Sequence, residues 1–78
     1  MNESDELISL YSIALFKQSI NQQFSSSRKS ALERSVVLAE FNKQNPKHAM
    51  SEDELEAALG VLVKQDIIMF TNQHVYLI

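Results

Sequence analysis

The stretch Ser51–Ile78, SEDELEAALGVLVKQDIIMFTNQHVYLI, decides the fold of this chain. Ser51 with Glu54 three residues later has the spacing of a capping box, in which each residue satisfies a backbone N–H that a helix start leaves unpaired. The spacing predicts a helix over about residues 51–65, and we expect Gly60 within it to allow close approach of another backbone. An apolar stripe at helical spacing supports this helix: Leu55, Ala58, Leu59, Leu62 and Val63.

Two short apolar runs follow, 67–71 and 74–78, with polar Asn72-Gln73 between them. This pattern predicts an antiparallel hairpin over 67–78 that pairs position 70 with 75, 69 with 76 and 68 with 77. Successive side chains of a strand point to opposite faces. One face is wholly apolar and is expected to cover the helices: Ile68, Phe70, Val75 and Leu77. The other face is mixed, which makes part of it a candidate partner-binding surface: Ile67, Met69, Thr71, His74, Tyr76 and Ile78.

The upstream residues predict two more helices. Ser4 or Asp5 is a suitable cap for a helix over about 5–27, with acidic side chains in its first turn. Two interpretations of the next segment stay open. One is a single helix from Ser30 to Gln44; the other is an extended piece around 31–33, then a helix over about 35–44 capped by Ser35. The expected first helix has two apolar stripes: Leu7, Leu10, Tyr11 and Ala14, then Ile13, Phe16, Ile20 and Phe24.

Three helices followed by a two-stranded hairpin make a winged helix-turn-helix fold, mostly α, and 78 residues suffice for one domain. Asn45-Pro46 ends the second helix, and Met50 is expected to pack under the third. The chain has no Cys, which excludes disulfides and thiolate metal sites. No apolar run approaches the ~20 residues of a membrane span, and the acidic N-terminus is unlike a signal peptide. We therefore expect no membrane partner.

Charge is unevenly distributed along the chain. The net charge is −3, but residues 15–50 carry +4 and residues 51–78 carry −4. The basic segment 28–47 is open to three interpretations: a solvated face, contact with an acidic protein, or contact with the DNA backbone. Its candidate contact residues are Arg28, Lys29, Arg34, Lys43 and Lys47.

The third helix begins with four carboxylates. Capping and the helix dipole explain them better than acid–base catalysis does. Winged helices often place this helix in the DNA major groove, where these carboxylates would repel phosphate. We therefore expect weak or no DNA binding by this helix, and treat Glu52, Asp53 and Glu56 as candidate contacts to a protein partner. One glycine rules out a glycine-rich phosphate loop, and His48 and His74 lack further metal ligands. We expect no catalytic residue, metal or cofactor.

Several segments resemble a known family. They are Leu15-Phe16-Lys17 with Phe24, then Phe41-Asn42-Lys43, and above all the Ser51–Ile78 stretch, with Glu56-Ala57-Ala58-Leu59, Ile68-Met69-Phe70 and Val75-Tyr76-Leu77-Ile78. Over about residues 13–78 the chain resembles the C-terminal winged-helix domain of minichromosome maintenance helicase subunits, most closely subunit 3. It departs from the family in the turn Asn72-Gln73, which has no Gly, and in the serine run 25–27.

The resemblance implies that the chain is a C-terminal piece of a ring ATPase of the nuclear replicative helicase, whose ATPase motifs lie upstream. It also implies a regulatory, docking role. Its partners would be the origin recognition complex and its loader ATPase during replication licensing, with neighbouring helicase subunits reached through the parent protein. The alternative is a nucleic-acid-binding winged helix that contacts the DNA backbone through the basic 28–47 segment.

Overall fold

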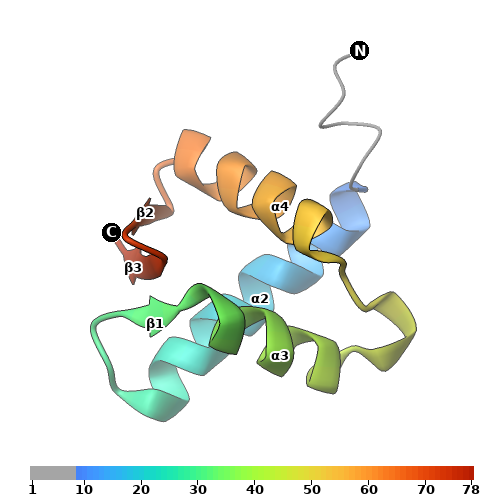
Figure 1. The fold of residues 1–78 in the computed structure, drawn as a ribbon, viewed down its shortest axis with the longest axis horizontal. Coiled ribbons are helices and arrows are strands. Elements are labelled where there is room, and N and C mark those ends of the chain that lie inside the picture. Colours follow the sequence, from blue (N-terminus) through green and yellow to red (C-terminus); the bar gives the residue numbers. More distant parts are fainter. Residues whose placement is uncertain (1–8) are drawn as a thin grey trace.

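The structure is a computed structural model that describes residues 9–78, and it has the winged-helix architecture (Figure 1). Three α-helices pack together, and a small antiparallel sheet closes one end of them. The predicted fold class is confirmed. The elements are α2 (Leu10–Ser27), β1 (Leu32–Glu33), α3 (Arg34–Gln44), the 3-10 turn η1 (Pro46–His48), α4 (Glu52–Lys64), β2 (Ile68–Thr71) and β3 (His74–Leu77).

The first helix begins later than the sequence suggests. Ser9 has extended backbone, and its side chain accepts a hydrogen bond from the Ser12 N–H, so α2 starts at Leu10 with no acidic residue in its first turn. Ser4, Asp5 and Leu7 lie outside the described residues. The second predicted stripe is buried, but Leu10 and Tyr11 of the first stripe are 86% and 61% exposed. They are exposed because α3 and α4 pack against the other side of α2.

An extended piece precedes α3, as the second of the two open interpretations predicts. Leu32 and Glu33 form strand β1, which pairs with β3, so the sheet has three strands in the order β1-β3-β2. The predicted two-stranded wing is present, and β1 adds a third strand to its sheet, which was not predicted. The predicted cap was also wrong: Glu33, not Ser35, occupies the N-cap position of α3 and makes no side-chain capping bond. Strand pairing explains the shift, because the Arg34 N–H donates to the Gln73 carbonyl in the wing turn, 2.9 Å away.

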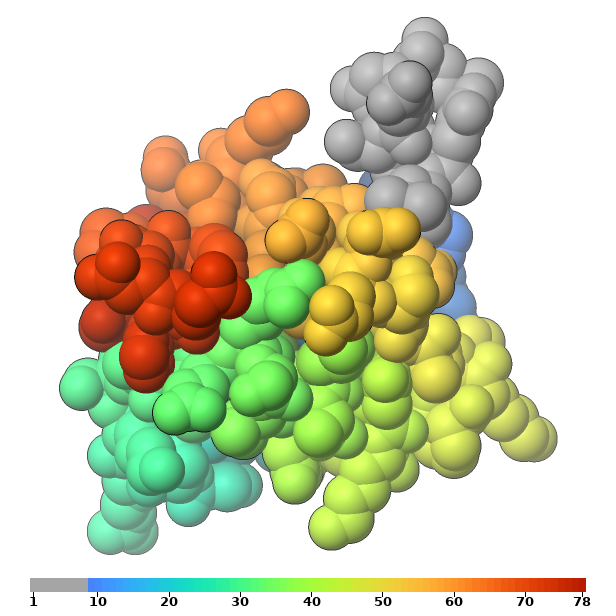
Figure 2. All heavy atoms as spheres, in the orientation of Figure 1, coloured from blue at the N-terminus to red at the C-terminus, as the bar shows by residue number. Residues whose placement is uncertain are grey.

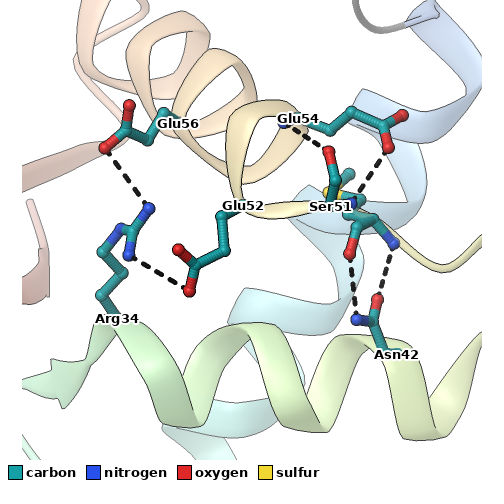
Figure 3. A network of polar contacts seen from close by, with 7 residues as sticks. Arg34, Asn42, Ser51, Glu52, Glu54 and Glu56 are labelled. Atoms are coloured by element: carbon teal, nitrogen blue, oxygen red, sulfur yellow. Dashed lines mark hydrogen bonds and ion pairs between the residues drawn. The ribbon is translucent and has the colours of Figure 1, made fainter.

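The connection from α3 to α4 is held by Asn42. Its amide donates to the Met50 carbonyl at 3.1 Å, and its side-chain oxygen accepts from the Met50 N–H at 2.7 Å (Figure 3). This pair of bonds fixes the chain just before the N-cap of α4. Met50 is 5% exposed and belongs to the core, as a residue that packs under α4 would.

Helix α4 has the predicted capping box, with both of its bonds present. Ser51 accepts from the Glu54 N–H at 3.2 Å, and the Glu54 carboxylate accepts from the Ser51 N–H at 3.0 Å. The expectation for Gly60 was wrong. Gly60 is exposed, and a Cβ added there would meet no atom within 4 Å. No other backbone approaches, because Gly60 lies on the solvent side of α4.

The wing has the predicted register, which pairs Ile68 with Leu77, Met69 with Tyr76 and Phe70 with Val75. Asn72 and Gln73 both have positive φ, 51° and 63°, as a tight hairpin turn of the type I′ class requires. The turn therefore forms without glycine. On the predicted inner face Ile68 and Val75 are buried, but Leu77 is 41% exposed. Leu77 is near the end of β3, where it borders an open hollow together with Phe24 and Lys29.

The core lies between the three helices and the inner face of the sheet. The Phe16 and Phe41 rings meet edge to face with centroids 5.6 Å apart, which joins α2 to α3. A buried polar link reinforces that contact: Ser19 donates to Gln44 at 2.8 Å, and Gln23 donates to Ser19 at 3.1 Å. The core side chains are Ile13, Phe16, Ile20, Phe24, Leu32, Val37, Phe41, Met50, Leu55, Ala58, Leu59, Leu62, Ile68 and Val75.

Candidate functional site

The outer face of the sheet presents apolar side chains to solvent. Met69 is 54% and Ile78 is 72% exposed, whereas Tyr76, the cross-strand partner of Met69, and Ile67 are half-buried. Residues 67–78 include no Asp, Glu, Lys or Arg. We call this surface the outer wing face, and it consists of the six residues of the mixed face predicted above: Ile67, Met69, Thr71, His74, Tyr76 and Ile78.

The polar end of the outer wing face lies at the turn. Thr71 is exposed and His74 is half-buried, and the two face each other across the end of the hairpin. The His74 Nδ1 lies 2.7 Å from the Asn72 carbonyl oxygen, so this nitrogen carries the proton and donates it. His74 thereby fixes the turn locally. The rest of the face is left for apolar contact.

Two of the carboxylates at the start of α4 are engaged in ion pairs. Glu52 and Glu56, four residues apart on one side of α4, both reach Arg34 at the start of α3 (Figure 3). The Arg34 guanidinium is 3.8 Å from the Glu52 carboxylate and 3.3 Å from the Glu56 carboxylate. Of the three predicted acidic contacts, only Asp53 lacks an ion-pair partner among the described residues.

The five predicted basic residues do not form one patch. Arg28 and Lys29 are exposed in the connection between α2 and β1, where they line a hollow with Ser30 and Leu77. Lys43 is exposed at the far end of α3, which lies about 14 Å along the helix axis from Arg34 at 1.5 Å per residue. Lys47 is exposed beyond it on η1. Arg34 belongs to the ion pairs described above.

The surface hollows are small and open. One of about 360 Å³ lies between the wing turn and the start of α3, lined by Glu33, Arg34, Ser35, Gln73 and His74. Across residues 9–78, no three or more His, Cys, Asp or Glu side chains gather in a way that could hold a metal ion. Within the same range, no helix is both long and apolar enough to span a bilayer.

The wing lies at one end of the molecule, where it packs against α4, and α4 runs from there toward the middle (Figure 1). Figure 2 shows the wing, in red, bordering the start of α3, in green, and the start of α4, in yellow, lies beyond it. A family model described as the MCM3-like winged helix domain matches residues 7–78. The chain belongs to this family. No curated protein and no solved structure matches the chain in the comparisons made.

Two sets of contacts in this MCM3-like winged helix domain were not predicted from the sequence. Arg34 pairs with carboxylates 18 and 22 positions away, and Asn42 bonds to backbone 8 positions away. No periodic pattern marks such contacts. The only signal for the first is opposite charge in two neighbouring segments, and the only signal for the second is a single Asn near a helix end.

Proposed function

We propose that this domain is a protein-docking module of the replicative DNA helicase, and that the outer wing face is its contact surface. The observation that carries the proposal is the exposed apolar face, which bears no Asp, Glu, Lys or Arg. Charged residues are depleted at the centres of protein interfaces, and Met and aromatic side chains are enriched there. A nucleic-acid surface has the opposite character, because phosphate contact requires Lys and Arg.

The proposed partners follow from membership of the MCM3-like family. The domain would recruit its helicase ring, in the nucleus, to the origin recognition complex and the loader ATPase during replication licensing. Its ring ATPase would then be supplied by the remainder of the parent subunit, and the domain itself would contribute binding and no chemistry. Asp53 is exposed and has no ion-pair partner among the described residues, so it is the predicted α4 contact that stays available to a partner, whereas Glu52 and Glu56 pair with Arg34.

A binding measurement tests the proposal. The domain is titrated against the assembled origin recognition complex with its loader, and Met69→Glu, which places a charge on the outer wing face, is expected to weaken binding at least tenfold. Val36→Glu is the matched control, because Val36 is a similarly exposed apolar residue, 45%, on α3. Absence of binding by the unaltered domain at tens of micromolar, or equal loss in both variants, would reject the proposal.

The exposed cations Arg28, Lys29, Lys43 and Lys47 support a second function, weak contact with the DNA backbone. Arg28 and Lys29 lie between α2 and β1, and the two lysines lie at the end of α3 and on η1, so the four match a diffuse electrostatic attraction better than a groove-reading site. A salt titration against duplex DNA separates this function from docking: no binding at low salt removes it.

A further inference from the structure

Arg34 joins three elements of the domain. Its backbone N–H bonds to the wing turn at Gln73, and its side chain reaches across to Glu52 and Glu56 on α4. The side chain is only 17% exposed, whereas the side chains of Glu52 and Glu56 are 74% and 67% exposed. The two carboxylates therefore lie between the guanidinium and the solvent.

This arrangement reverses the electrostatic character of the position. A lone arginine beside the third helix of a winged helix would be a phosphate contact, because that helix and its neighbours are the elements that approach DNA. Here one positive charge is surrounded by two negative ones, so the group has a net charge of −1. Any phosphate that approaches Arg34 must also approach Glu52 and Glu56. Glu33 and His74, which line the adjacent hollow with Arg34, add no fixed positive charge.

The stability of α4 itself rests on its capping box and its buried apolar stripe. The Arg34 side chain, by contrast, is mostly buried, so its charge needs carboxylates nearby. Because both carboxylates stay exposed, the same ion pairs also set the charge that this surface presents to a partner.

We propose that the Arg34–Glu52–Glu56 triad is a specificity element, which denies Arg34 to nucleic-acid phosphate and keeps the α4 and wing end of the domain for protein. The inference rests on the proposed docking function and deepens it, since it assigns a residue-level reason for the preference. It also gives Glu52 and Glu56 a different role from the direct partner contact expected from the sequence. In this role they act on Arg34 from within the domain.

The experiment measures DNA affinity after the carboxylates are neutralised without change of shape. The Glu52→Gln/Glu56→Gln variant is titrated with a fluorescent duplex at several salt concentrations. We expect its affinity at low salt to rise at least fivefold over the unaltered domain, and the slope of log K against log salt to steepen by about one phosphate contact. Adding Arg34→Gln to this variant should abolish both changes. The melting temperature of each variant verifies that the fold is retained.

A charge-matched control separates the effect of the triad on DNA affinity from the effect of net charge. Glu40→Gln/Asp66→Asn also removes two negative charges, but from positions outside the triad. A gain of the same size in this control, no gain in Glu52→Gln/Glu56→Gln, or a gain that survives Arg34→Gln would each overturn the inference. None of these results tests the docking function. That function is measured separately, with the protein partner and with Met69→Glu.

Discussion

At the residue scale, Gly60 lowers the stability of α4 although no packing contact requires a glycine at this position. It is exposed in the interior of α4, its φ is not positive, and a Cβ would meet no atom within 4 Å. Glycine in a helix interior costs about 1 kcal/mol relative to alanine, because the unfolded chain has more backbone freedom to lose.

Gly60→Ala is therefore expected to stabilise the domain by about 0.5–1 kcal/mol. Urea denaturation followed by circular dichroism gives the free energy of unfolding of both proteins. A destabilised variant would contradict the open space beside Gly60. Ala57→Gly, one turn earlier on the same helix, is the reverse control and should destabilise the domain.

At the scale of elements, the α3–α4 connection depends on one side chain. Asn42 both donates to and accepts from the Met50 backbone, and Met50 is itself buried immediately before the capping box of α4. The two bonds set where α4 begins relative to α3. Asn42 therefore positions the helix that carries the acidic part of the candidate site.

Asn42→Ala is expected to destabilise the domain by about 1–3 kcal/mol, since it leaves a part-buried N–H and carbonyl without partners. Asn42→Asp is the matched variant. It keeps an oxygen to accept from the Met50 N–H but loses the donor to the Met50 carbonyl, so we expect an intermediate loss in urea denaturation. Equal stability of Asn42→Ala and the unaltered domain would show that water replaces both bonds without cost.

At the scale of the whole molecule, the core is thin and each large side chain matters. A 78-residue domain has a stability of about 4–12 kcal/mol at the usual 0.05–0.15 kcal/mol per residue. Phe41 is fully buried, and its ring meets Phe16 of α2 edge to face. Burial of this one ring therefore contributes a sizeable share of the free energy of unfolding.

Phe41→Ala should cost about 3–5 kcal/mol, through lost burial and the cavity that it leaves. Its urea midpoint, followed by circular dichroism at 25 °C, is expected to fall sharply below that of the unaltered domain. Val36→Ala, at an exposed position of the same helix, should change the stability by no more than about 0.5 kcal/mol. A similar loss in both variants would contradict the assignment of the core.

The periodic features were predictable from the sequence. The stripe of α4, its capping box, the wing register and the Asn72-Gln73 turn all depend on spacings of two to four residues, and the structure has each of them. The exception is Val63 of the predicted stripe, which is 40% exposed near the end of α4. The start of α2 was not predicted correctly, because Ser4, Asp5 and Ser9 are all suitable capping residues and local chemistry does not rank them. The outer wing face was predicted as a surface, and its use in docking stays a prediction.

By itself, the sequence determined the helix that becomes α4, with its capping box, and the hairpin that follows it, since these features depend on neighbours along the chain. Only the tertiary structure decided that β1 joins the sheet, that Asn42 holds the backbone before α4, and that Arg34 sits under Glu52 and Glu56. These contacts join residues 8 to 43 positions apart. They depend on how α2, α3 and α4 pack around a shared core, which no local spacing encodes.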